Sequence, residues 1–187
     1  MYFLVFTPVK FRVKRKLKGK RKNLLNILYK ELENNKNKLE ISFKYHQSIK
    51  AEIDSIGKVL NESDFFTTYI GNKKFRHDRI KGWNGVKNAN LDDMAFEAAK
   101  ISGIIKEFDF EIIQNISEIY KFQKEYSEFG NSILKKMINF NSSTKVADVF
   151  GSIDLITSDL KNYEKSLIEA IKKAQSVLTK PQNNGFK

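Results

Sequence analysis

The stretch NLLNILYKELENNKNKLEISFKYHQSIKAEIDSIGKVL, residues 23–60, indicates the fold class of this chain. Its apolar residues recur at a heptad-like spacing, at Leu25, Leu28, Leu32, Leu39, Ile49, Ile53, Ile56 and Leu60. This period is typical of an amphipathic helix that packs along one seam, as in a coiled coil. At a rise of about 1.5 Å per residue the helix would be about 55 Å long, so it needs packing partners along that length.

Three polar residues interrupt this seam. Asn35, Ser42 and His46 stand where apolar residues are expected. A polar residue on a helix seam usually fixes the register of packing. We expect His46 to be a hydrogen-bonded interior histidine.

Residues 61–90 form an irregular stretch that contains glycines and several aromatic residues. It is too aromatic to be disordered, and a long connection inside a compact domain must pack or function. We expect a short helix near residues 64–70, followed by an ordered crossover. Trp83, between Gly82 and Gly85, is expected to plug the bundle.

Helical periodicity resumes after the crossover. Asn90 and Asp93 resemble a capping box that opens a short helix through Ala95 and Ile101. A third helix of about thirty residues follows residues 108–110, and a fourth follows the break at 141–143 and ends at Pro181.

These patterns predict an all-α protein. The simplest arrangement is an up-down four-helix bundle with three long helices, one short helix and an aromatic basic crossover. The expected organisation is a basic N-terminal arm (1–22), the helical bundle (23–180) and a C-terminal tail (181–187).

The charge is unevenly distributed. The chain has 34 Lys and Arg against 22 Asp and Glu, a net charge of +12, and residues 1–22 hold nine of these basic groups and no acid. A second basic region lies in the crossover, so an anionic partner would meet two patches. Chain order places these patches at opposite ends of the bundle.

The N-terminal arm has the composition of a membrane-surface anchor. Its apolar residues 1–9 are too few to cross a bilayer, and they precede the basic residues, the reverse of a secretory signal. Aromatic residues would enter the headgroup region and cations would face anionic lipid. The cations assigned to this surface are Lys14, Arg15, Lys16, Lys20 and Arg21. A solvated chain end without a function is the alternative.

The crossover is a candidate anion-binding site. Basic groups interleaved with aromatic rings can pair with phosphates and stack on bases. The candidate residues are Lys73, Lys74, Arg76, Arg79, Lys81 and Trp83. The simpler interpretation is a solvated loop held in place by Phe75 and Trp83.

Tests for catalytic and metal chemistry are mostly negative. The absence of Cys removes disulfides and thiolate chemistry, and the chain has only two His, 31 residues apart, so no metal site and no cofactor is expected. The architecture resembles that of the helical HEPN ribonucleases. In those enzymes four to six residues separate an Arg from the His that follows it, and no Arg stands at that spacing before His46 or His77. The pair Asp92 and Asp93 is explained by a place in the first turn of a helix.

Two stretches resemble a loose group of uncharacterised bacterial helical proteins, many with a membrane helix just before the first bundle helix. The first stretch is Leu24–Asn35, and the second comprises Gly82–Gly85, Leu91–Gly103 and Ile119–Tyr126. The resemblance implies a membrane-adjacent bundle and transfers no catalytic residue. The usual spanning segment is missing here, unless residues 1–9 are its remnant or the gene starts upstream.

We therefore expect a non-enzymatic helical interaction or sensory module at a membrane surface, cytoplasmic or membrane-peripheral. Its expected partners are an anionic membrane surface or another protein, and self-association into a homo-oligomer is left open. The alternative is a nucleic-acid-binding protein that uses the arm and the crossover. An enzyme built on His46 or the Asp92/Asp93 pair is the third interpretation.

Overall fold

A computed structural model describes the backbone of residues 8–179 and the side chains from residue 19 onward. This part of the chain is all-α, as predicted, and contains no β-strand beyond an isolated antiparallel bridge between Thr68 and Lys145. The elements in chain order are α1 (Pro8–Gly57), α2 (Glu62–Phe65), the 3-10 turn η1 (His77–Arg79), α3 (Met94–Ile101), the 3-10 turn η2 (Ile104–Glu107), α4 (Phe110–Ile138), α5 (Val146–Asp154), the π-helical η3 (Leu155–Leu160) and α6 (Lys161–Thr179).

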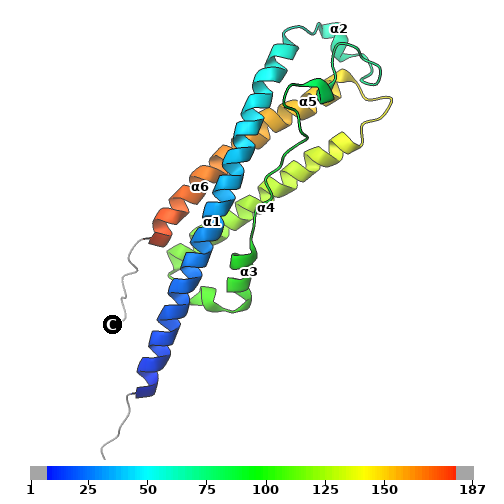
Figure 1. Cartoon of the computed structure of the whole chain (residues 1–187). Helices are drawn as coiled ribbons and strands as arrows, with labels where there is room; N and C mark the ends of the chain where they lie inside the picture. The colour runs from blue at the N-terminus through cyan, green and yellow to red at the C-terminus, as the bar shows by residue number, and fades with distance from the viewer. Residues whose placement is uncertain (1–7, 180–187) are drawn as a thin grey trace, which may run out of the picture.

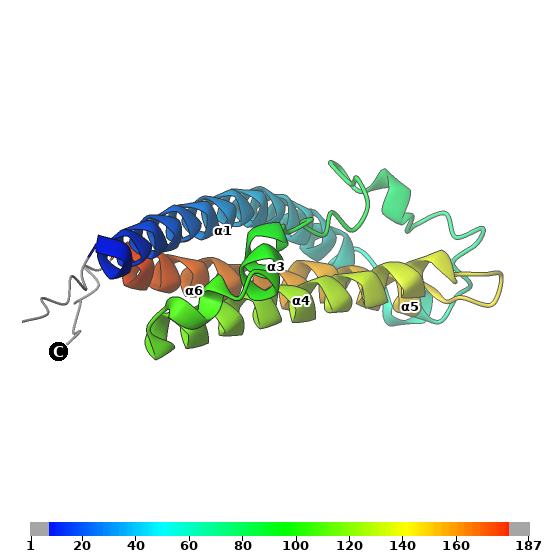
Figure 2. The same cartoon turned by 90° about the horizontal axis from the view of Figure 1, so that it is seen from below.

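Three long helical rods form the body (Figure 1). α1 runs up, α4 also runs up, and α5, η3 and α6 follow one another as a single rod that runs down and packs against both. The part of the chain that connects the top of α1 with the start of α4 is mostly not helical. Residues 84–93 return along α1 as an extended segment and end in the short helix α3, which lies between α1 and α4 (Figure 2).

Apolar side chains form two core clusters. The larger one surrounds Leu28, Leu32 and Leu39 of α1, and the smaller one surrounds Ile49 and Ile53 near the other end of that helix. Trp83 is half-buried and packs against both clusters. This position agrees with the plugging role expected for its ring.

The polar residues of the α1 seam face the extended segment. The Asn35 side chain donates to the Asp92 carbonyl at 2.7 Å and accepts from the Asp92 amide at 2.8 Å. Ser42 Oγ lies 2.7 Å from the Lys87 carbonyl. Because buried backbone groups need hydrogen-bond partners, side chains of α1 supply here what a helix or sheet would supply internally.

Two local expectations need correction. α1 begins at Pro8, fifteen residues before the expected start at Asn23, so the part of the basic arm from residue 8 onward is helical. Proline suits a first helical position because its missing N–H has no partner there. The capping box at Asn90 and Asp93 is also wrong, because α3 begins at Met94 and Asp93 makes no side-chain cap.

Other segments agree with the expectations to different degrees. α4 has 29 residues, close to the predicted thirty. The helix expected near residues 64–70 is misplaced, because the single turn α2 ends at Phe65 and residues 66–70 are not helical. A Cβ on Gly130 would lie 2.4 Å from the Asn88 side chain, so this glycine admits the extended segment against α4. The expected C-terminal tail (181–187) lies outside the described residues.

Asn35→Leu is expected to destabilise the protein although it completes the apolar seam. The substitution leaves the Asp92 amide and carbonyl without their partner, a loss of about 1–3 kcal/mol that outweighs the added apolar contact. Urea unfolding measures the change in unfolding free energy. The control is Asn37→Leu on the exposed side of the same helix, and an equal effect of both substitutions would contradict this account.

Candidate functional site

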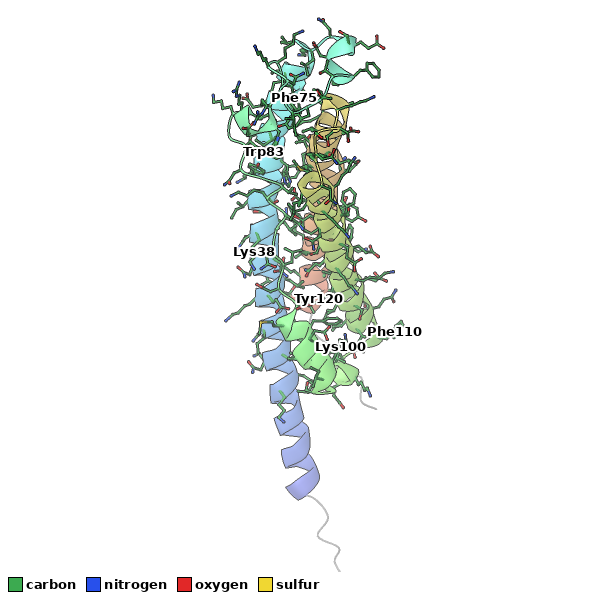
Figure 3. All side chains as sticks on the ribbon, turned by 90° about the vertical axis from the view of Figure 1, so that its right-hand side faces the viewer. Lys38, Phe75, Trp83, Lys100, Phe110 and Tyr120 are labelled. Atoms are coloured by element: carbon green, nitrogen blue, oxygen red, sulfur yellow. The ribbon has the colours of Figure 1, made fainter. Side chains whose placement is uncertain are left out.

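The N-terminal part of α1 continues beyond the other helices (Figures 1 and 3). The predicted membrane-surface residues Lys14, Arg15 and Lys16 lie on this helix, and their side chains are outside the described part. Lys20 is exposed. Arg21 is half-buried, with its guanidinium 5.7 Å from the centre of the Phe108 ring. One helix therefore carries all five predicted residues, and Arg21 anchors it to the body.

The basic crossover lies at the other end of the molecule, where Figure 3 labels Phe75 and Trp83. Lys74 pairs with Asp64 at 2.9 Å, and the Arg76 guanidinium pairs with Asp78 at 3.1 Å. These cations hold the pKa values of both carboxyl groups below their usual range. Two of the five predicted basic groups are thus neutralised within the fold.

The other predicted residues of the crossover are arranged differently. Lys73, Arg79 and Lys81 are exposed, and no ion pair involves them among the residues that the structure describes. Phe75 is 1% exposed. The Trp83 ring is half-buried and meets the ring of His77 edge-on at 5.6 Å. The basic groups therefore face solvent while the aromatic rings pack inward.

His77 belongs to this packed cluster. Its Nδ1 lies 2.5 Å from the Tyr69 hydroxyl. Burial lowers the pKa of His77, and the Arg76 cation acts in the same direction against the opposing effect of Asp78. The ring is thus a hydrogen-bonded part of the turn that supports the crossover.

A network of buried polar groups crosses the middle of the body. Glu164 of α6 is fully buried, and its carboxyl group lies 2.5 Å from Ser42 Oγ, 2.9 Å from the Tyr126 hydroxyl and 2.9 Å from His46 Nδ1. His46 Nε2 lies 2.7 Å from the Val86 carbonyl. The network joins α1, the extended segment, α4 and α6.

The geometry determines where protons must lie in this network. The Val86 carbonyl can only accept, so His46 Nε2 carries a proton. A second proton must lie between Nδ1 and the Glu164 carboxyl group, since neither a bare ring nitrogen nor a carboxylate can donate. Histidine and glutamate therefore form one hydrogen-bonded pair that replaces water at both groups.

Of the residues of the enzymatic interpretation, His46 and Asp92 are engaged in structural contacts. Asp92 and Asp93 precede α3 instead of standing in its first turn as expected, and Asp93 lines a cavity. His46 is fully buried with both ring nitrogens bonded, as its seam position predicts. Asp92 accepts from Lys38 at 2.7 Å, and this ammonium holds the pKa of Asp92 below its usual range. Among the side chains that the structure describes, residues 19–179, no group of three or more His, Asp or Glu is placed to hold a metal ion.

Glu164 and Tyr126 were not identified as partners of His46 from the sequence. Glu164 lies between Leu160 and Leu167 on the apolar face of the last helix, and a charged residue at such a position was the available signal. The partner could not be inferred, because nothing in the sequence aligns the last helix with the first.

Comparisons with known proteins leave the family open. No family model, no curated protein and no solved structure matches this chain. In the described part, none of the helices combines the length and apolar character needed to cross a membrane.

Glu164→Gln is expected to lower the unfolding free energy by about 1–3 kcal/mol, because an amide offers one acceptor oxygen where the buried carboxyl group uses both of its oxygens. Urea unfolding at neutral pH measures this loss. Glu169→Gln, on the exposed side of α6, is the matched control and should stay within about 0.5 kcal/mol. An equally small effect at position 164 would show that the network is not stabilising.

Alkaline pH is expected to unfold the protein through two buried tyrosines. Burial raises the pKa of Tyr120 and Tyr126, and the carboxylates of Glu31 and Glu164 beside them add to the shift. Below about pH 10 both the folded and the unfolded chain keep these protons, so stability is complete. At higher pH only the unfolded chain releases them, so stability falls.

Unfolding free energies between neutral and strongly alkaline pH, with phenolate absorbance, test this tyrosine effect. Tyr126→Phe should flatten the pH dependence relative to the parent, whereas the half-buried Tyr29→Phe should leave it unchanged. An unaltered slope in the Tyr126 variant would contradict the assignment.

Proposed function

We propose that this chain is a non-enzymatic helical interaction module that attaches to an anionic membrane surface through the N-terminal part of α1. In this proposal the body is an up-down bundle of four legs, with the extended segment and α3 together forming the short one. The observation that carries the proposal is the continuity of α1 from Pro8 into the body.

A continuous helix places the basic residues from Lys10 to Lys22 on one rod. Residues 1–22 contain nine basic residues and no acidic one, and the helix extends beyond the body (Figure 3). Near an anionic bilayer each Lys or Arg contributes about 1 kcal/mol in favourable cases. Several such residues on one rod support appreciable attachment that salt would weaken.

The crossover supports attachment to anions less well than α1. Asp64 and Asp78 already pair with two of its cations, at 2.9 and 3.1 Å. Single-stranded nucleic acid would need exposed rings for its bases to stack on. Phe75 is buried and Trp83 packs against both core clusters, so nucleic-acid binding remains the second candidate.

Sedimentation with lipid vesicles tests the membrane proposal. The full chain is expected to sediment with vesicles that contain about one third phosphatidylserine and to stay in solution with phosphatidylcholine vesicles. Replacing Lys14, Arg15, Lys16, Lys20 and Lys22 by Gln should abolish sedimentation. Arg21 is kept because it contacts Phe108.

The matched control replaces five cations at the other end by Gln: Lys73, Lys74, Arg76, Arg79 and Lys81. This variant should sediment like the parent. If the control loses binding while the α1 variant keeps it, the contact surface is the crossover and the proposal fails. Binding of a mixed-sequence single-stranded oligonucleotide more tightly than of vesicles, lost on replacing Arg76, Arg79 and Trp83, would favour the nucleic-acid candidate.

A further inference from the structure

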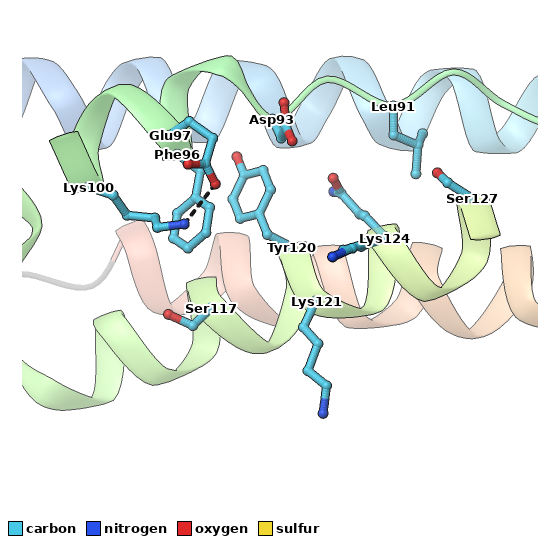
Figure 4. Close-up of a pocket in the computed structure, with 11 residues that line it drawn as sticks. Leu91, Asp93, Phe96, Glu97, Lys100, Ser117, Tyr120, Lys121, Lys124 and Ser127 are labelled. Carbon is cyan, nitrogen blue, oxygen red and sulfur yellow. Dashed lines mark hydrogen bonds and ion pairs between the residues drawn. The ribbon is translucent and has the colours of Figure 1, made fainter.

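A cavity of about 450 Å³ opens between α3, the extended segment and α4. Figure 4 shows its walls, in which the rings of Phe96 and Tyr120 lie against each other. These rings are parallel, with centres 4.4 Å apart, and Leu91 adds a further apolar wall. The volume falls within the range of small-molecule sites, which combine apolar walls with a few polar groups.

Gln123 supplies an unsatisfied donor to this cavity. The residue lines the cavity and is 4% exposed, and its Nε2 has no hydrogen-bond partner among the described residues. A buried donor without an acceptor is costly, so each such group in a native fold calls for an explanation.

The orientation of the Gln123 amide follows from its neighbours. The Asp92 backbone fixes the Asn35 amide, because the Asp92 N–H donates to Asn35 Oδ1 and the Asp92 carbonyl accepts from Asn35 Nδ2. Asn35 Nδ2 also donates to Gln123 Oε1 at 3.2 Å. Gln123 therefore directs its oxygen to Asn35 and is left with its N–H groups as free donors.

Three cations and two carboxylates line the cavity, so the excess of positive charge favours an anionic acceptor; they are Lys100, Lys121, Lys124, Asp93 and Glu97. Lys100 pairs with Glu97 at 2.8 Å and lies 5.2 Å above the Phe96 ring. Lys124 lines the cavity near Tyr120 in Figure 4, and its nearest carboxylate, on Glu128, is 3.8 Å away. The Tyr120 hydroxyl already donates to Glu31 at 2.6 Å. The donors left for a ligand are therefore the exposed Lys124 Nζ and Gln123 Nε2. The latter has less than 1 Å² of accessible area, so the Gln123 amide must turn toward the cavity to meet a ligand.

We propose that this cavity binds a small aromatic carboxylate. The carboxylate would accept from Gln123 Nε2 and Lys124 Nζ, and the ring would lie among Leu91, Phe96 and Tyr120. This site is separate from the basic part of α1. If the chain is attached to a membrane as proposed above, the carboxylate would be the ligand that the attached module senses.

Binding of 2-naphthoate to the full chain, followed by NMR, tests the site. Naphthoate is expected to shift the side-chain amide signals of Gln123 and the backbone signals of residues 96–100 and 120–124. Its neutral amide analogue should bind at least about tenfold more weakly, because a charged acceptor forms the stronger hydrogen bond. Inorganic phosphate, which lacks a ring, should leave these signals unchanged.

Gln123→Glu replaces the free donor by an acceptor of the same shape while it keeps the oxygen that faces Asn35. Naphthoate affinity should fall by about tenfold or more. Gln114→Glu, on the exposed side of α4, is the matched control and should bind like the parent. If the Gln123 variant fails to fold, Lys124→Gln at an exposed position tests the site instead. This substitution should lower the naphthoate affinity by about threefold or more. Undiminished binding in the folded variant, or equal shifts with phosphate, would overturn the proposal.

Discussion

The fold depends on hydrogen bonds between side chains of α1 and the backbone of residues 84–93. An extended segment inside a helical protein has neither a sheet nor a helix to satisfy its N–H and C=O groups. Asn35 and His46 satisfy Asp92 and Val86 from one side. The single proton of the Ser42 hydroxyl is shared between the Lys87 carbonyl and Glu164, and Tyr126 of α4 accepts from the Ala89 amide. An apolar seam of ideal heptads would leave these groups unpaired.

This constraint explains the layout of the surfaces. Because the segment is held along α1 and against α4, it separates these helices and leaves the cavity beside Gln123 on the α4 side. Glu164 lies in the first turn of α6, and its carboxyl group reaches the same polar centre. The body is thereby tied together at its middle, and the basic surfaces lie at its two ends.

The sequence predicts best where apolar residues recur over many turns. α4 and the break after it follow from spacing and from Asn141, Ser142 and Ser143. The start of α1 did not follow, because the cluster of like charges in residues 10–22 suggested a solvated arm. Lys and Arg are good helix formers, and a helix already nucleated in the body extends into them at small cost. The place of the cations in the chain was thus predictable, whereas their position on a continuous helix was not.

The amino-acid sequence by itself determined the all-α class, the approximate helix limits and the two basic regions, because periodicity, helix-breaking residues and charge are local properties. Only the tertiary structure decided that Glu164 meets His46, that Asp64 and Asp78 neutralise crossover cations, and that Gln123 keeps a free donor. Those outcomes depend on the alignment of segments distant in the chain, and that alignment is set by the packing of whole helices.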